Sequence, residues 1–357
     1  MNKQIVSSKI NRNYIIDLFR FIAAISVALY HYSYGSLSRI QFDSTHDTFL
    51  PFFFKYGYLG VDFFFLISGY VIFLSAEKKS IIQFIRSRFI RLYPAYWICL
   101  SLTFSFIILF GQDIFNVSIK QFVVNLSMVH TLFKVEHIDS VYWTLFVELK
   151  FYIFIAVLIL IRDKFNFSFR PFIILWFLMS LTPLLFDFSS RYLFRLFNST
   201  LILNWSSYFI AGMLFFRIYK FGILKKYIFS IVLTMILSVL NAVKFANKLF
   251  NDFQDENFSI FVVAGIVVVF YLIMFLAATN KFIRISSPKL FVLGAITYPL
   301  YLIHHHVGII ILRDLNTIMN YDLVVVSLLI FMILVAYLIY RFGEQPFSKL
   351  IGKLFIN

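Results

Sequence analysis

Long apolar runs alternate with short polar segments along the whole chain. Ten of these runs are long enough to be predicted as membrane-spanning helices. They cover residues 14–34, 56–76, 92–111, 141–161, 171–187, 201–216, 228–243, 257–279, 290–312 and 322–340. Residues 121–133 are apolar but short, so we predict an interfacial or re-entrant segment there. The pattern therefore predicts an all-α polytopic membrane protein with one domain over residues 1–357 and short tails at 1–13 and 341–357.

Composition agrees with this pattern. The chain is 61% hydrophobic and 14% charged, with a mean hydropathy of +0.87. A soluble domain is nearer half apolar and a quarter charged. The chain has one cysteine, Cys99, so an internal disulfide is excluded.

The net charge of +15 reflects the placement of lysines and arginines in the short loops. With the N-terminus on the inner side, inner segments hold 21 of the 32 Lys and Arg and outer segments hold nine. This is the positive-inside distribution, which explains the charge without a nucleic-acid partner. Acidic residues show the opposite bias, and both termini are predicted to be cytoplasmic.

The first span carries an arginine, Arg20, and a histidine, His31. Eleven steps of 100° along a helix bring the two side chains to within about 20° of the same direction. The residues therefore share one face and lie roughly 16 Å apart along the helix axis. Such groups inside a membrane need a partner, water or a ligand. We expect an anionic ligand near Arg20 and proton chemistry at His31. The alternatives are a structural ion pair between Asp17 and Arg20 and an interfacial His31 bonded to a neighbouring helix.

Two carboxylates are candidate partners for this histidine. Asp62 is near the outer end of the second span, although it is alternatively a residue that faces the outer water. Glu148 lies about two turns into the fourth span, at a depth similar to His31 if the first and fourth spans pack together. A carboxylate beside an imidazole orients it for general-base catalysis. The alternative for Glu148 is a structural pair with Lys150 or an arginine.

The segment RSRFIRLYPAYW precedes the third span and places Arg88 and Arg91 on one helix face, after Arg86. Arginine suits bidentate contacts to phosphate, whereas the alternative is ordinary anchoring at the inner membrane surface. Pro94 is predicted to break the helix at this point.

The ninth span reads ITYPLYLIHHH, with Tyr298, Tyr301 and His304 spaced three residues apart along one face. His305 and His306 extend this polar patch. Consecutive helix positions point in different directions and chelate one ion poorly, so no metal is expected.

Six motifs occur in a fixed order: Arg20-x10-His31, GVDFFFLISGY, Arg88-x-x-Arg91 with LYP, Trp143 with Glu148, TYPLYLIH, and a terminal EQP. The ordered set resembles the membrane acyltransferase-3 family, the integral-membrane O-acyltransferases of bacterial surface glycans. The resemblance extends from about residue 12 to 350. It implies ten spans in the bacterial inner membrane with both termini cytoplasmic. Gln345 departs from the family pattern, in which a basic residue is common before the final proline.

The resemblance also implies a reaction, in which acetyl-CoA donates an acetyl group to a hydroxyl of a surface or extracellular glycan such as capsule, O-antigen or exopolysaccharide. The family also has members with an extracellular hydrolase-like domain, which is not expected here. In this scheme the candidate catalytic residues are His31, Glu148 and Asp62, and the donor contacts are Arg20, Arg88, Arg91, Arg86, Tyr298, Tyr301 and His304. Two alternatives remain: a transporter or flippase for a glycan or lipid-linked sugar, and a sensor or scaffold without catalysis. Acetyl-CoA-dependent labelling of a glycan separates them.

Overall fold

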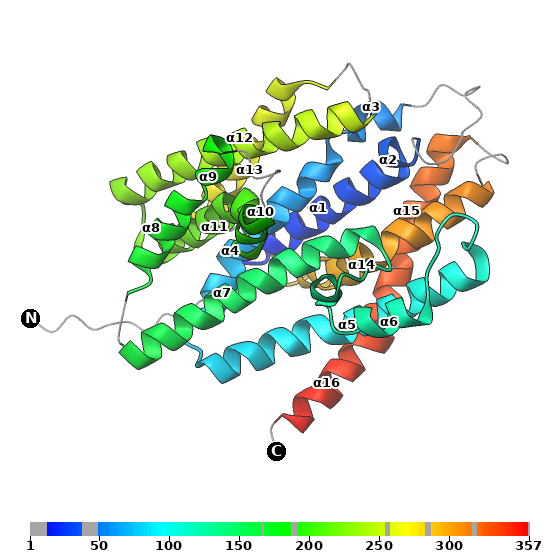
Figure 1. Cartoon of the computed structure of the whole chain (residues 1–357), viewed down its shortest axis with the longest axis horizontal. Coiled ribbons are helices and arrows are strands. Elements are labelled where there is room, and N and C mark those ends of the chain that lie inside the picture. The colour runs from blue at the N-terminus through cyan, green and yellow to red at the C-terminus, as the bar shows by residue number, and fades with distance from the viewer. Residues whose placement is uncertain are drawn as a thin grey trace, which may run out of the picture.

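The computed structural model describes residues 13–37, 49–165, 168–186, 192–253, 258–282, 287–315 and 320–355. The described residues form helices and connecting segments, with no strand among them (Figure 1). The predicted N-terminal tail lies outside these residues except for Asn13. The helices are α1 (Ile15–Tyr32), α2 (Tyr34–Leu37), α3 (Leu50–Phe54), η1 (Gly57–Leu59), α4 (Gly60–Ala76), α5 (Ile81–Phe110), α6 (Ile119–Asn125), η2 (His130–Phe133), η3 (Ser140–Tyr142), α7 (Trp143–Phe165), α8 (Arg170–Met179), α9 (Thr182–Leu185), α10 (Tyr192–Thr200), α11 (Leu203–Phe221), α12 (Lys225–Phe253), α13 (Ile260–Ala278), α14 (Leu290–Leu315), α15 (Tyr321–Leu338), η4 (Ile339–Glu344) and α16 (Gln345–Leu354).

Within the described residues, nine helical segments are long and apolar enough to cross a membrane. This confirms the predicted all-α polytopic membrane fold. The segments are Ile15–Tyr32, Leu50–Ala76, Ile81–Phe110, Ser140–Phe165, Tyr192–Phe221, Lys225–Leu249, Ile260–Ala278, Leu290–Leu315 and Tyr321–Leu354. The short apolar segment 121–133 contains only α6 and η2, so it forms no span, as expected.

The predicted span 171–187 is the exception, because it forms the shorter helices α8 and α9. Pro183 has no N–H to donate to the carbonyl of Met179, four residues earlier. The hydroxyl of Thr182 donates to that carbonyl instead, at 2.6 Å. The local sequence therefore ends one helix and begins another within a run that hydropathy alone reads as continuous.

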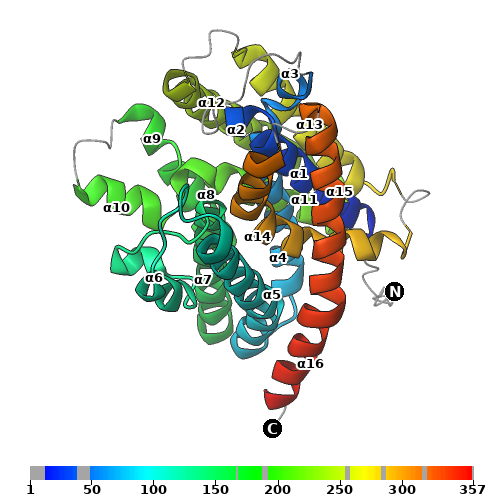
Figure 2. The same ribbon diagram turned by 90° about the vertical axis from the view of Figure 1, so that its right-hand side faces the viewer.

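Helix α14 forms the centre of the bundle (Figures 1 and 2). Its most apolar window is 94% buried, against 28% for α13. Helices α1, α5 and α15 all pack against α14, and α4 packs between α1 and α11. Because α1 and α14 carry half of the candidate site residues, the candidate site lies in the middle of the protein.

Glycine brings two pairs of these helices into close contact. Gly69 and Gly212 lie at the crossing of α4 and α11, where a Cβ on Gly212 would collide with the carbonyl of Leu66. A Cβ on Gly294 of α14 would collide with the buried Asp17 of α1. Small residues at such crossings let membrane helices approach each other closely.

Helix α5 begins earlier than predicted and continues through Pro94, so the predicted break is wrong. It starts with a capping box in which the Ser80 hydroxyl accepts from the backbone of Gln83 and the Gln83 side chain accepts from the backbone of Ser80. Proline at position 94 leaves the carbonyl of Ile90 without its helical donor. The Ser348 hydroxyl of α16 donates to this carbonyl at 3.3 Å, which compensates for the missing bond.

The last span is longer than predicted because α15, η4 and α16 form one continuous rod whose end lies beyond the bundle (Figure 2). Much of the predicted C-terminal tail 341–357 is therefore helical. Segment η4 is a π-helix that directly precedes Pro346. Its wider turn places Glu344 inward, where the residue is 4% exposed.

The crossing of α4 and α11 gives a test of this packing. Gly212→Val should lower the thermal unfolding temperature of the detergent-solubilised protein strongly, because the new side chain forces two helices apart. The matched control is Gly265→Val on α13, where a Cβ meets nothing within 4 Å. Equal melting temperatures for the two variants would contradict the close crossing.

Candidate active site

A cavity of about 750 Å³ lies at the end of α1 where Arg20 is found. Helices α1, α4, α5, α7 and α14 supply its walls. We call it the basic chamber, because five cations and two carboxylates line it: Arg20, Lys78, Lys79, Arg88, Arg91, Asp17 and Glu148. The excess of positive charge in a shielded space favours an anionic ligand.

Arg88 and Arg91 point into the basic chamber from one face of α5. Arg88 donates to the Ser75 hydroxyl at 3.0 Å, and its buried Nε has no hydrogen-bond partner. Arg91 pairs with Glu344 at 2.7 Å. Burial and the nearby Arg88 guanidinium lower the pKa of Lys79.

Arg86 does not line the basic chamber, so the structure does not group this predicted donor contact with Arg88 and Arg91. Its side chain is exposed and its guanidinium lies 5.6 Å from the ring of Phe355. Two residues along a helix correspond to about 200°, which places Arg86 opposite Arg88 on α5.

A second cavity, of about 670 Å³, lies at the other end of α1. We call it the histidine chamber, because His31 lines it. Asp62 of α4 lines the same cavity and is 8% exposed. The structure thus brings together His31 and one of its two predicted carboxylates.

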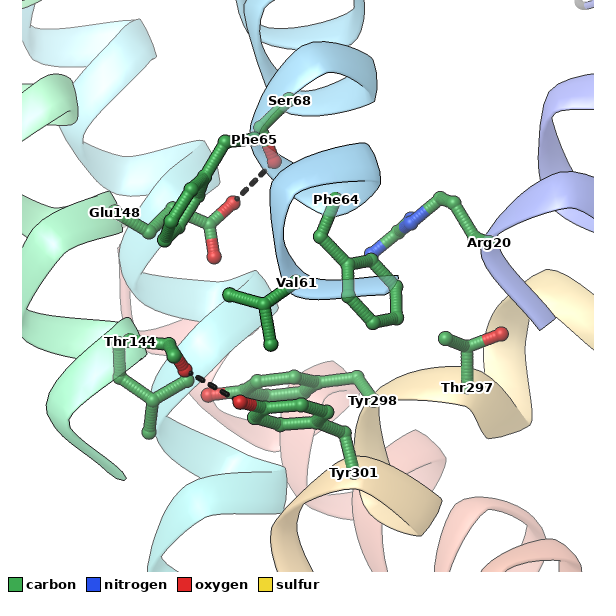
Figure 3. Close-up of a pocket in the computed structure, with 11 residues that line it drawn as sticks. Arg20, Val61, Phe64, Phe65, Ser68, Thr144, Glu148, Thr297, Tyr298 and Tyr301 are labelled. Atoms are coloured by element: carbon green, nitrogen blue, oxygen red, sulfur yellow. Dashed lines mark hydrogen bonds between the residues drawn. The ribbon is translucent and has the colours of Figure 1, made fainter. Parts of the chain in front are cut away.

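A small pocket of about 50 Å³, which we call the waist, lies between the two chambers (Figure 3). It shares Arg20, Glu148 and Tyr298 with the basic chamber. It shares Val61 and Tyr301 with the histidine chamber. The three spaces therefore follow one route along α1 and α14, in the order in which Arg20 and His31 occur on the helix.

Glu148 lies at the Arg20 end of this route and lines the waist and the basic chamber, not the chamber of His31. Its Oε1 accepts from the Ser68 hydroxyl at 3.0 Å and from the Tyr152 hydroxyl at 2.8 Å. In Figure 3, Arg20 and Glu148 enter from opposite sides of Phe64. The predicted orientation of His31 by Glu148 does not fit this geometry, because α4 packs against both α1 and α7 and stands between them.

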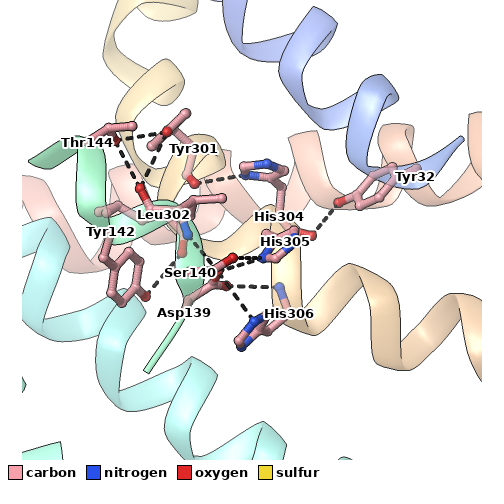
Figure 4. A network of polar contacts seen from close by, with 11 residues as sticks. Tyr32, Asp139, Ser140, Tyr142, Thr144, Tyr301, Leu302, His304, His305 and His306 are labelled. Atoms are coloured by element: carbon pink, nitrogen blue, oxygen red, sulfur yellow. Dashed lines mark hydrogen bonds and ion pairs between the residues drawn. The ribbon is translucent and has the colours of Figure 1, made fainter. Parts of the chain in front are cut away.

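The carboxylate next to the histidines is Asp139, which sequence reasoning missed as a site residue (Figure 4). Its Oδ1 lies 2.7 Å from His305 Nδ1, and the His305 ring lies 4.3 Å from the ring of His31 between centroids. An ionised carboxylate only accepts, so the proton in this bond belongs to His305 Nδ1. Burial by itself raises the pKa of Asp139, but the adjacent histidines and their hydrogen bonds hold it below its ordinary value.

The predicted stripe on α14 divides along the route. The hydroxyl of Tyr298 lines the waist region without a hydrogen-bond partner. The hydroxyl of Tyr301 forms a hydrogen bond of 2.9 Å with the hydroxyl of Thr144. His304 is fully buried and lines none of these three spaces. Its ring centroid lies 5.4 Å from that of His31, so the structure places this predicted donor contact beside the histidines and not along the cavities. The stripe residues are three positions apart, whereas one helical turn takes 3.6 residues. The stripe therefore winds around α14 and leaves the cavity.

A family model described as an acyltransferase domain matches residues 13–341. The chain belongs to the acyltransferase-3 family. Every residue that lines the two chambers and the waist lies within the matched range. No curated protein and no solved structure matches the chain. The chain is thus a multi-pass membrane acyltransferase.

Asp139, His305 and His306 of this acyltransferase offer ligand atoms within 4.8 Å of one another, as a metal site would. The carboxylate, however, already accepts from the backbone N–H groups of Val141 and His306 as well as from His305. The His306 ring stacks on Phe115 with centroids 3.7 Å apart. Protein donors therefore satisfy the carboxylate, and the geometry fits a hydrogen-bonded anchor for His305.

Replacement of the anchor gives a direct test. Asp139→Asn should destabilise the acyltransferase by roughly 1.5–3 kcal/mol, the range for hydrogen bonds to a charged group, because three buried donors lose their anionic acceptor. Chemical denaturation in detergent measures the change. Asp113→Asn is the control, since Asp113 carries an exposed carboxylate. An effect no larger than that of the control would contradict the role of Asp139 as an anchor.

Proposed function

We propose that this membrane acyltransferase moves an acetyl group from acetyl-CoA to a hydroxyl of a surface or extracellular glycan in bacteria. The observation that carries this proposal is the pair of polar chambers joined by a waist along one face of α1. Acetyl-CoA has a highly charged head and a long thin arm that ends in the thioester. Its shape matches a broad basic cavity that narrows toward His31.

The phosphates of the donor would bind in the basic chamber. Arg88 has a buried Nε without a partner, and Arg91 lies on the same face of α5. A phosphate oxygen accepts from such guanidinium groups by charge-assisted bonds. Arg20 lines both the chamber and the waist, so it would meet the donor deeper along the route.

Where the waist borders the histidine chamber, at Val61 and Tyr301, the thioester carbon meets the acceptor hydroxyl. His31 removes the proton of the hydroxyl while its oxygen forms a bond to the acyl carbon. The carbon–sulfur bond then breaks, and the CoA thiolate leaves and receives the proton. Tyr298 has a hydroxyl free to donate to the developing oxyanion.

His305 replaces Glu148 as the group that fixes His31 in this scheme. Asp139 holds the His305 ring, and that ring lies against His31. Because a general base must be oriented toward the proton it abstracts, this contact favours proton transfer at His31. Asp62 lines the same chamber and supplies negative charge near the imidazolium that forms.

The side of the membrane follows from the charge distribution. Lys78 and Lys79 precede α5, and Arg88 and Arg91 lie on its first turns. They belong to the inner segments, which hold 21 of the 32 lysines and arginines and are predicted to be cytoplasmic. With α8 and α9 counted together as a tenth, broken span beside the nine membrane-length segments of the described chain, both termini would then be cytoplasmic in the bacterial inner membrane. Acetyl-CoA is a cytoplasmic metabolite, so the basic chamber would open to the compartment that holds the donor.

The size of the waist favours transfer of a small group over transport of a saccharide. The waist measures about 50 Å³, against about 750 and 670 Å³ for the two chambers, which suits an acyl group better than a sugar ring. Together with family membership, this favours acyl transfer over a transporter or flippase.

Donor binding is testable with two arginines of one helix. Arg88→Gln should weaken binding of CoA to the purified protein about tenfold or more, because a charged hydrogen bond is worth about 1.5–3 kcal/mol. Arg86→Gln, on the opposite face of α5, should leave the affinity unchanged. Isothermal titration calorimetry measures both values, and equal losses in the two variants would contradict the assigned phosphate site.

The role of His31 is testable by radiolabelled acetyl transfer from acetyl-CoA to isolated surface glycan in membranes. His31→Ala should lower the rate at least about a hundredfold, in line with the loss of a general base. Its affinity for CoA should stay within about twofold of the wild-type value, since His31 lies outside the basic chamber. Normal transfer by a correctly inserted His31→Ala protein would refute the mechanism.

A further inference from the structure

We propose that the histidine chamber selects an acceptor with negative charge, namely a saccharide that carries carboxylate or phosphate groups. The inference rests on the proposed function, because it specifies the acceptor of the same site. It starts from three side chains outside the catalytic scheme: Arg195 of α10 and Lys244 and Lys248 of α12, which all line the chamber. Lys244 and Lys248 are four residues apart and share one helix face.

Among the residues that the structure describes, these cations are not balanced by the groups around them. Among the described residues that line the chamber, Asp62 is the one carboxylate. Within the described chain, Arg195 and Lys248 form no ion pair, and Lys244 donates to the carbonyl of Pro183 at 2.7 Å. By contrast, Arg313 pairs with both Asp113 and Asp314. The described lining of the chamber therefore presents an excess of positive charge to an incoming ligand.

Membrane topology does not explain this excess. The chamber lies at the His31 end, where the predicted outer segments hold only nine of the 32 lysines and arginines. Three of these nine surround one cavity. The positive-inside rule depletes outer loops of cations, so their concentration here needs a ligand-based reason.

The remaining walls suit a saccharide. The rings of Trp143 and Trp205 lie 5.0 Å apart, and those of Tyr58 and Phe245 lie 5.8 Å apart. All four residues line the chamber. Aromatic faces in such a wall pack against the C–H faces of sugar rings, whereas a lipid chain would favour an apolar lining without cations.

Two amide side chains in the chamber wall each have a buried polar atom without a hydrogen-bond partner, which a ligand hydroxyl could supply. Asn241 lines the chamber and is 8% exposed, and its buried Nδ2 has no hydrogen-bond partner. The Oδ1 of Asn198 is likewise buried in the chamber wall without a donor. A buried polar atom without a partner costs free energy that a bound ligand can recover. Sugar hydroxyls donate and accept, so they satisfy both amides at once.

The test measures binding of saccharides to the full-length purified protein by tryptophan fluorescence. The chain has four tryptophans, and two of them line the chamber. The first probe is an oligosaccharide of alternating glucuronic acid and N-acetylglucosamine, and the second is its carboxyl-reduced, neutral form. The third is the neutral form with a terminal diphosphate, as in a lipid-linked carrier.

We expect at least one charged probe to bind about tenfold more tightly than the neutral one at low salt. The difference should shrink at high salt, because the cations are exposed and screened. Preference for the glucuronate probe assigns the charge to the sugar itself, and preference for the diphosphate assigns it to the carrier. Equal affinity for all three probes overturns the inference.

Variants then connect the preference to the wall of the chamber. Lys248→Gln and Arg195→Gln should each weaken binding of the preferred charged probe about three- to tenfold and leave the neutral probe unchanged. Lys120→Gln is the matched control, since Lys120 is exposed on α6 and lies outside the chamber. Losses equal to those of the control contradict the inference.

The two proposals fail in distinguishable ways, because fluorescence reports binding without acetyl-CoA. Charge-selective binding without acetyl transfer would refute the proposed function and retain the acceptor class. Equal acetyl transfer to charged and neutral saccharides, with equal binding, would retain the function and refute the acceptor class.

Discussion

One energetic cost shapes this structure: Arg20 and His31 lie in a single, mostly apolar helix inside the membrane. A guanidinium and an imidazole in the interior of a membrane protein require polar surroundings. Helix α1 meets this requirement through a separate polar cavity at each of the two residues. The neighbouring helices are arranged accordingly, with glycine at the crossings and charged side chains directed into the two cavities. The polar residues of α1 thus determine where its neighbours may pack closely and where they must leave space.

Much of the fold was predictable because hydropathy depends on local sequence. Nine of the predicted spans correspond to membrane-length helices in the described chain. The errors occur at prolines. Pro94 was predicted to end a helix that continues, and Pro183 lies in a run that divides into two helices. At Pro94 the outcome depends on the hydroxyl of Ser348, a residue 254 positions away in the sequence, which no local pattern reveals.

The candidate site was predictable where one helix presents both partners. Arg20 with His31, and Arg88 with Arg91, follow from helical periodicity, and the exposed position of Arg86 follows from the same rule. Contacts between elements were not predictable. Glu148 was paired with His31 on similar depth alone, whereas α4 separates their helices. Asp139 lies in a short connection before α7, and only the packing of η3 against α14 brings it to His305. In the sequence Asp139 is only an acidic residue before a membrane span, and outer loops of membrane proteins carry such residues without any role in a site.

The waist has an electrical consequence. The chambers on either side are lined by charged side chains, so water that fills them would make the insulating part of the protein much thinner than the bilayer around it. The membrane potential then falls mainly across the short segment between Arg20 and His31, where a charge moved across 100 mV exchanges about 2.3 kcal/mol with the field. In the proposed reaction the acetyl group is uncharged and would pass this segment without electrical work. The phosphates of the proposed donor and the charged groups of the proposed acceptor would each stay in their own chamber, outside the region where the voltage acts.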